Sequence, residues 1–340
     1  MRLLMLPYFL PSPPPSRRQP DSNRKSARLS KPDGFYGLLF LLATLCLVAM
    51  NPIRALAIEK GETVVHRENS LYQFIIVIDN TEKNERYLAN LEKTTLYQGG
   101  IKLDAPEQLL FEYTRMSFVG LSFLEQIPKD ALFLGLGIGA MPRFMAGHFP
   151  ETTIEVAEID PAVVSIAKEY FSFKESGRMT VKTVDGRQFI KRSKKGYNII
   201  FLDAYQGETI PFHLTTREFL QEAKARLNKD GVVVSNILSP KKNNFFTAMV
   251  KTYHAEFANL AIFKGKESGN YVFVATERAV APEVVRKRAQ EIQASRQLGI
   301  DLAGISQDQQ VTSVPEAKAE ILTDDFAPVN LYRHMEEGQP

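Results

Sequence analysis

The strongest constraint on the fold of this chain is an alternation of strand-like and helix-like segments that begins at Ala131. Short apolar runs are each followed by a segment with helical spacing of its apolar residues, and two further β-type runs close the region. The strand-like runs are ALFLGL, TTIEVAEI, MTVKTV, YNIIFLDA, GVVVSNIL, NLAIFK and NYVFVAT. Fully apolar strands that alternate with amphipathic helices predict a parallel sheet covered on both faces. We therefore expect a Rossmann-like domain over residues 128–278, with its ligand beyond the C-terminal ends of the strands.

Three other regions surround this domain. Residues 58–105 contain short β-branched and aromatic runs separated by turn residues, which predicts a small antiparallel β domain. Residues 106–127 have helical spacing with Pro106 in a first-turn position, and we expect a linker helix there. Residues 279–340 hold one further helix and a tail that contains LTDDFAPV. The expected fold class is α/β, a Rossmann-like class I methyltransferase-type sheet with a small N-terminal antiparallel β domain.

Residues 1–57 have the pattern of a targeting leader. A basic flank precedes an uncharged apolar segment, Phe35–Ile53, and a small-x-small site follows at Ala55–Ala57. The segment is of borderline length for crossing a bilayer, so a cleaved signal peptide and an uncleaved signal anchor both remain open. We expect an exported or membrane-anchored protein. A misassigned start or a bipartite targeting sequence is a further interpretation of the long Arg/Ser-rich flank, and a misassigned leader would make the protein cytoplasmic.

Composition excludes several classes of function. The leader holds 8 of the 42 Lys and Arg residues and 2 of the 39 Asp and Glu residues, so the remaining chain is net negative. A body of that sign gives no electrostatic reason to expect a nucleic-acid partner. The single cysteine, Cys46, lies in the leader, so the rest of the chain has no disulfide, thiol nucleophile or cysteine-ligated zinc.

A glycine-rich loop, LGLGIGA, directly follows the first predicted strand of the large domain. Gly135, Gly137 and Gly139 would let the backbone approach a ligand closely at the start of a helix. The spacing G-x-G-x-G is not the full dinucleotide fingerprint G-x-G-x-x-G. A tight turn without a ligand therefore remains an equal interpretation of the loop by itself.

The next two strands end in acidic residues. Glu158, in VAEID, follows the glycines by about 20 residues, the separation at which an acid takes ribose hydroxyls. Asp160 is better explained as the N-cap of a helix that begins at Pro161. Asp185, in VDGRQF, can take a purine amino group or serve as a turn acid. Together with the glycines, two acids without a phosphate-binding lysine loop favour an adenosine that carries a charged sulfur.

Asp203 ends the fourth strand, beside the same crevice. A carboxylate there can accept a proton from a nucleophile that attacks a sulfonium carbon, or it can only cap the loop. Three histidines, His66, His148 and His213, are isolated from one another without metal-ligand spacing. We interpret them as surface or core histidines and expect no metal.

These residues resemble the spermidine synthase family of aminopropyltransferases, and within it the bacterial spermidine-synthase-like proteins. The resemblance covers about residues 72–238, and LTDDFAPV near the end is also similar to the bacterial group. The motifs stand in the family's order and are YQ at Tyr72 and Gln73, GLGIGA, VAEIDP, VDGRQF and FLDAYQGETIPFHLTTREFL.

The resemblance implies a role for each matched position. Gln73, Glu158, Asp185 and Gly186 would bind the thioadenosine part of decarboxylated S-adenosylmethionine, and Pro211 would lie in the loop over this donor. Asp203 would accept the proton of an attacking amine, which is otherwise mostly protonated at neutral pH. The resemblance also implies a homodimer or tetramer.

The acceptor side departs from the family. Family synthases hold the diamine with an acid in the glycine loop, where this chain has Ile138, and with a second acid where it has Gln206. The family's YHE in the linker helix is replaced by Tyr113, Thr114 and Arg115. Two lost carboxylate partners, each worth roughly 1.5–3 kcal/mol, put transfer to putrescine in question unless Glu208 substitutes. The acceptor-pocket candidates are Tyr113, Tyr205, Gln206 and Glu208.

Three hypotheses follow. The leading one is aminopropyl transfer from decarboxylated S-adenosylmethionine to an amine or other nucleophile, with Asp203 as proton acceptor. The second is an S-adenosylmethionine-dependent methyltransferase, although such enzymes usually carry an acid two residues before the first glycine, where this chain has Phe133. The third is a non-catalytic nucleoside-binding protein, which the leader favours because these donors are made in the cytoplasm.

Overall fold

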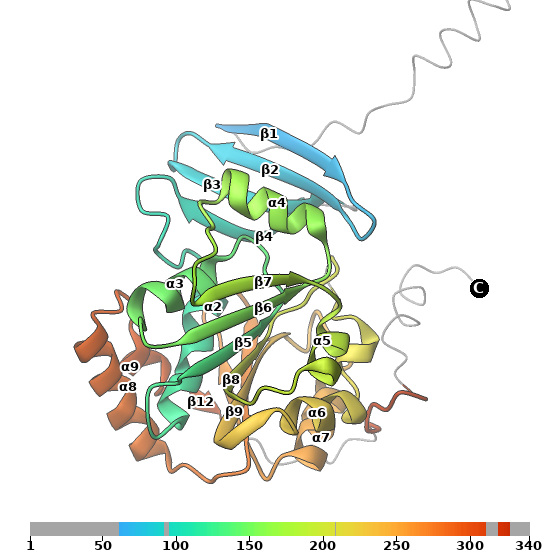
Figure 1. Ribbon diagram of the computed structural model, residues 1–340, viewed down its shortest axis with the longest axis vertical. Helices are drawn as coiled ribbons and strands as arrows, with labels where there is room; N and C mark the ends of the chain where they lie inside the picture. Colours follow the sequence, from blue (N-terminus) through green and yellow to red (C-terminus); the bar gives the residue numbers. More distant parts are fainter. Residues whose placement is uncertain (1–60, 92–94, 208, 311–318, 327–340) are drawn as a thin grey trace, which may run out of the picture. The chain divides into compact units, whose positions relative to one another are not determined.

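We analysed a computed structural model of the chain (Figure 1), which describes residues 61–91, 95–207, 209–310 and 319–326. The leader, with Cys46 and the apolar segment, and the acceptor candidate Glu208 lie outside the described residues. Within the described ranges, no helix combines the length and the apolar character needed to cross a bilayer.

The first described element is a four-stranded antiparallel sheet in simple sequence order (Figure 1). Its strands are β1 (Glu62–Asn69), β2 (Phe74–Asn80), β3 (Glu85–Leu91) and β4 (Thr95–Lys102). The centre of β2 is buried on both faces, because Ile75 and Val77 belong to the main core while Ile76 and Ile78 pack in a separate cluster. The expected small antiparallel sheet is therefore present, and its β1–β2 turn contains the YQ motif.

The linker differs from the continuous helix that the sequence predicts from Pro106. Helix α2 spans only Glu112–Ser117 and passes into a 3₁₀ helix, η1 (Phe118–Phe123). The carbonyl groups of Leu109 and Leu110 accept hydrogen bonds from the Arg115 side chain instead of continuing a helix. At Gly120 the chain approaches the large sheet so closely that a β-carbon would lie 2.3 Å from Val234 Cγ2.

The large sheet has eight strands in the order β12-β10-β11-β9-β8-β5-β6-β7. The run from β9 to β7 is parallel, whereas β11 pairs antiparallel with both β9 and β10. The strands are β5 (Asp130–Leu134), β6 (Thr153–Glu158), β7 (Met179–Thr183), β8 (Tyr197–Leu202), β9 (Leu227–Leu238), β10 (Asn259–Lys264), β11 (Asn270–Thr276) and β12 (Gln309–Gln310). The strand order reverses direction at β5, which lies between β6 and β8, so the switch point falls between the loops after β5 and β8.

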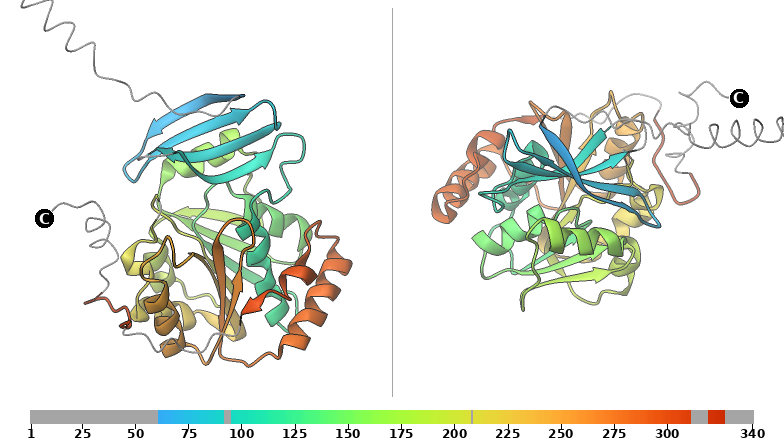
Figure 2. Two further views of the ribbon diagram at one scale, coloured as in Figure 1. Left: turned by 180° about the vertical axis from the view of Figure 1, so that it is seen from behind. Right: turned by 90° about the horizontal axis from the view of Figure 1, so that it is seen from above.

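Helices cover both faces of this sheet, as its uniformly apolar strands predict (Figures 1 and 2). One face packs against α3 (Ala140–His148), α4 (Pro161–Tyr170), η1, α8 (Pro282–Arg296) and α9 (Leu302–Ile305). The other packs against α5 (Gly186–Arg192), α6 (Arg217–Lys224) and α7 (Phe246–Glu256). On the first of these two faces, Phe133 is stacked on Phe201, with ring centroids 4.4 Å apart.

Candidate active site

A cavity of about 630 Å³ opens at the C-terminal ends of the parallel strands. Its wall combines the loops after β5, β6, β7 and β8 with the β1–β2 turn, β4, α2 and the β10–β11 turn. All of the predicted donor and acceptor residues that the structure describes line it, except Gly139. A volume of this size accommodates a nucleoside-sized ligand with a second small molecule.

The three glycines of the loop after β5 serve different purposes. Gly135 has φ +97°, and a β-carbon there would lie 2.3 Å from the carbonyl oxygen of Asp203, so glycine lets the ends of β5 and β8 meet. Gly139 packs against Phe173 at the start of α3, outside the cavity wall. Gly137 has φ +52° and no atom within 4 Å of its would-be β-carbon, although it lines the cavity. Of the three, Gly137 is therefore the glycine whose backbone is open to the cavity.

Glu158 links the glycine loop to the loop after β6. Its Oε2 accepts a hydrogen bond from Leu136 N at 2.8 Å, and its Oε1 accepts one from Asp160 N at 2.9 Å. Burial raises the pKa of this carboxyl group, which is 8% exposed. Each carboxylate oxygen can accept a second hydrogen bond, so Glu158 can hold the loop and still take ribose hydroxyls.

The β1–β2 turn brings Gln73 to the donor side of the cavity. Ser70 Oγ donates to Asp160 Oδ2 at 2.6 Å, and Asp160 in turn caps α4 as the sequence predicts. The side-chain oxygen of Gln73 accepts a hydrogen bond from Gln98 Nε2 at 3.1 Å. Because this bond engages the oxygen, the amide nitrogen of Gln73 is the group available to donate to a ligand.

Asp185 caps α5 and also lines the cavity, so both of its interpreted roles are compatible. Its Oδ1 accepts from Gln188 N at 2.9 Å, and its Oδ2 lies 2.8 Å from His213 Nε2. The hydrogen bond from His213 holds the pKa of the Asp185 carboxyl group below its ordinary value. This contact was not predictable from the sequence, because His213 stands 28 positions away in a loop.

Asp203 lies directly after β8 at the switch point, partly exposed to the cavity. Its Oδ1 accepts a hydrogen bond from Asn236 Nδ2 at 2.9 Å, and the Tyr113 hydroxyl, which donates to the Gln98 carbonyl oxygen at 3.2 Å, is the second donor group near the carboxylate. Burial raises the pKa of Asp203 to about 7, against the lowering effect of these two donors. The carboxyl group is thus poised to take and release a proton near neutral pH.

Asn236 is a site residue that sequence reasoning missed. It stands in β9, is 5% exposed, and is itself oriented by Asn270 Nδ2, which donates to Asn236 Oδ1 at 2.8 Å. Its backbone oxygen accepts from the Tyr205 hydroxyl at 2.9 Å. A polar Ser-Asn pair inside the apolar run GVVVSNIL was the available signal.

The departures from the family pattern have structural explanations. Ile138 is 4% exposed and packs against β4, where a β-carbon on Gly99 would lie 3.0 Å from its Cγ1. Gln206 Nε2 donates to the carbonyl oxygen of Tyr72 at 3.1 Å, a bond that a carboxylate could not make. Arg115 is held by the Leu109 and Leu110 carbonyls. Each position is thus used for packing or for backbone contacts.

Glu112 is an acid in the cavity wall that the sequence did not single out. Its Oε1 accepts from Lys266 N at 2.7 Å, and its Oε2 accepts from Glu267 N, Ser268 N and Ser268 Oγ. These hydrogen bonds lower the pKa of Glu112 despite its partial burial. The carboxylate therefore fixes the β10–β11 turn, which forms one wall of the cavity.

Comparisons with known proteins agree with this geometry. The family model described as "Spermine/spermidine synthase domain" matches residues 110–263. A polyamine aminopropyltransferase of Vibrio vulnificus (strain CMCP6) is 34% identical over 286 residues, which are 80% of this chain and 92% of that protein.

Two solved structures share the fold. One, a spermidine synthase in complex with the transition-state analogue AdoDATO, has a TM-score of 0.54 and 21% identity over 71% of this chain and 88% of its own. The other, human methyltransferase-like protein 13 in complex with SAH, has a TM-score of 0.51 and 23% identity over 61% of this chain and 97% of its own.

The sheet order and the cavity at its switch point define a Rossmann-like fold with a ligand site at the strand ends, and the similarity to a polyamine aminopropyltransferase makes the chain a transferase. The relative from Vibrio vulnificus also identifies the family of this transferase, because the match covers 92% of that relative. The chain belongs to the spermine/spermidine synthase family, as the sequence motifs predicted.

Proposed function

We propose that this transferase moves an aminopropyl group from decarboxylated S-adenosylmethionine to a primary amine. Glu158, Asp185 and Gln73 would hold the thioadenosine part of the donor, with Gly137 giving its backbone close access. Asp203, at the switch point, would receive the proton of the amine.

The chemistry is a single displacement in this proposal. The amine lone pair forms a C–N bond to the methylene carbon attached to sulfur, and the C–S bond breaks with its electron pair remaining on sulfur. The sulfonium becomes a neutral thioether, methylthioadenosine, and the proton that the ammonium form of the acceptor gives up before the attack passes to the Asp203 carboxylate and then to water. An amine with a pKa of about 10.4 must lose that proton to react, which is why a nearby base accelerates the step.

One observation carries the proposal: the environment of Asp203. Its pKa of about 7 makes it a stronger base than an ordinary carboxylate while leaving a large fraction ionised at neutral pH. Asn236 fixes the orientation of the carboxylate beside the cavity.

The acceptor side supports an amine that is recognised mainly at its reacting end. Among the described residues, the two other carboxylates on that side are Glu112, which binds the β10–β11 turn, and Glu267, whose side chain is 77% exposed and lies 3.5 Å from Arg115. The neutral hydrogen-bonding residues Asn236 and Ser268 and the cation Lys242 also belong to the cavity wall. We therefore propose that one ammonium group bound by Asp203 suffices and that a second cation on the acceptor is not required.

Calorimetric titration with both sulfonium donors, followed by mass spectrometry of the products, tests the proposal. We expect tighter binding of decarboxylated S-adenosylmethionine and release of methylthioadenosine when a primary amine is added. A preference for S-adenosylmethionine with release of S-adenosylhomocysteine would instead identify a methyltransferase. Binding of either donor without any product would identify a nucleoside-binding protein.

A matched pair of acceptors tests recognition at one end. Putrescine and 1-aminobutane have the same carbon chain and differ by one ammonium group. We expect KM values for the two amines that lie within about tenfold of each other, which corresponds to less than 1.4 kcal/mol. A much larger preference for putrescine would require a second acid on the acceptor side and would overturn this part of the proposal.

We also propose that residues 35–57 direct the protein to export or to membrane anchoring. The basic flank, the apolar segment and the small-x-small site support this. Cell fractionation with mass spectrometry of the mature N-terminus distinguishes the outcomes, since a soluble cytoplasmic protein with an intact leader would contradict it.

A further inference from the structure

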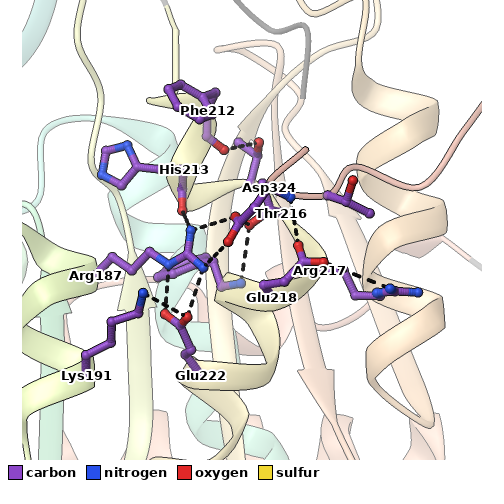
Figure 3. A network of polar contacts seen from close by, with 12 residues as sticks. Arg187, Lys191, Phe212, His213, Thr216, Arg217, Glu218, Glu222 and Asp324 are labelled. Carbon is purple, nitrogen blue, oxygen red and sulfur yellow. Dashed lines mark hydrogen bonds and ion pairs between the residues drawn. The ribbon is translucent and has the colours of Figure 1, made fainter. Parts of the chain in front are cut away.

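The buried guanidinium of Arg187 connects its own helix α5 with the loop that holds His213, with α6 and with the segment that holds Asp324 (Figure 3). Its Nε and Nη2 each lie 2.8 Å from the Glu222 carboxylate, and its Nη1 and Nη2 each lie 2.7 Å from the Asp324 carboxylate. Nη1 also donates to the carbonyl oxygen of His213 at 3.2 Å. A guanidinium has five N–H donors, so this set of acceptors uses all of them. Arg187 is 6% exposed, and such a group depends on every partner it has.

Asp324 belongs to the C-terminal LTDDFAPV motif, which the catalytic site does not otherwise use. The described part of this segment, residues 319–326, packs against the start of α6 and the middle of α7. Arg217 N donates to Leu322 O at 2.8 Å, and Leu322 N donates to Thr252 Oγ1 at 2.9 Å. Thr216 Oγ1, which caps α6, donates to Asp324 Oδ1 at 2.7 Å. The position of the Asp324 carboxylate is therefore fixed from several directions.

The other end of this network is in the cavity. His213, whose backbone oxygen contacts Arg187, places its ring Nε2 2.8 Å from Asp185 Oδ2. Both His213 and Asp185 line the cavity. Arg187 is also separated from Asp185 by only one residue at the start of α5. The α5 backbone at this point is held by its own hydrogen bond from Phe189 N to Asp185 O, so a change in the guanidinium position would reach the Asp185 carboxylate through the His213 ring.

We propose that Asp324 is a positioning residue of the donor site, which acts through Arg187 and His213 on the orientation of Asp185. Without its carboxylate, two N–H groups of the buried guanidinium lose their acceptor, and the guanidinium must tilt or admit water to regain one. Its contact with the His213 carbonyl then no longer fixes the loop of residues 211–214. The C-terminal motif is accordingly part of the donor site although it does not touch the cavity.

The inference rests on the proposed function only in taking the donor to be a thioadenosine derivative, and the probe is chosen accordingly. Methylthioadenosine contains the part that both sulfonium donors share, so its binding does not depend on which group the enzyme transfers. Asp324→Asn removes the charge and half of the paired contact, and the neighbouring Asp325→Asn, at an exposed residue of the same motif, is the matched control. We expect Asp324→Asn to weaken methylthioadenosine binding roughly tenfold, with Asp325→Asn within about twofold of wild type.

A double-mutant cycle with His213→Gln separates positioning from general destabilisation. If Asp324 acts through His213, the double variant binds methylthioadenosine about as weakly as His213→Gln alone, because the second change removes a link that is already broken. Fully additive losses, or equal binding by Asp324→Asn and Asp325→Asn, would overturn the proposal.

Two further outcomes bear on the role of Asp324. If Asp324→Asn does not fold, Asp324→Glu, which keeps the charge but lengthens the side chain, takes its place in the same cycle with the same criteria. If the wild-type protein does not bind methylthioadenosine, the donor site itself is refuted together with the role of Asp324. Methyl rather than aminopropyl transfer, in contrast, would refute the proposed function and leave this inference standing.

Discussion

Asp203→Asn should stabilise the folded protein at alkaline pH, since the wild-type carboxylate is ionised there at a free-energy cost. Burial raises the pKa of Asp203 from 3.8 to about 7, which means that the folded state retains a proton that the unfolded state has already released. The protonated Asp203 carboxyl group therefore contributes its full stabilisation below the pKa of 3.8 that it has in the unfolded state. This contribution is lost as the pH rises through about 7. At about 1.4 kcal/mol per pH unit, the wild type should lose roughly 2.5 kcal/mol relative to Asp203→Asn between about pH 5 and pH 8.

Urea denaturation of both proteins at these two pH values measures the effect. All other titrating groups are common to the two proteins, so the change in their stability difference isolates position 203. Asparagine keeps an oxygen that can accept the hydrogen bond from Asn236, which limits the disturbance to charge. An equal stability difference at both pH values would show that the carboxyl group titrates normally, and it would remove the basis for Asp203 as a base near neutral pH.

Three further predictions follow from the same cavity. Wild-type kcat/KM at saturating donor should rise with pH through about 7 as Asp203 ionises; a flat profile in that range would contradict its role as base. Gly135→Ala should destabilise the fold by more than about 2 kcal/mol in urea denaturation, since a β-carbon collides with the Asp203 carbonyl, whereas Gly137→Ala should cost only about 1–2 kcal/mol and mainly weaken donor binding. Gln206→Glu should weaken donor binding by about 0.5–1.5 kcal/mol, because a carboxylate cannot donate to the Tyr72 carbonyl; calorimetry showing unchanged affinity would make that contact irrelevant.

The sequence predicted the large sheet well because its signals are local. Each apolar strand carries its own pattern, and the acids at positions 158, 185 and 203 stand where their strands end. Parallel strands then bring these ends to one edge without any knowledge of side-chain contacts. The order of the motifs along the sequence predicted the family, and the comparisons confirm that prediction.

Contacts between distant segments were not predictable in the same way. The role of Glu112 depends on a turn about 155 positions later, and the role of His213 depends on the N-cap of α5. The linker was expected to be helical from Pro106, but Arg115 binds the carbonyl groups of the preceding residues and the helix begins only at Glu112. In each case a side chain makes a contact that the periodicity of the sequence does not encode.

The close contact between Ile138 and Gly99 has a consequence for any attempt to redirect the acceptor. An acid at position 138 would exchange an apolar contact for a charge beside β4, and as long as Ile138 is present a β-carbon at position 99 would lie 3.0 Å from its Cγ1. Directed evolution toward diamines should therefore show epistasis between the two positions. A polar side chain at position 99 that could pair with such an acid would be accepted only after Ile138 has been replaced.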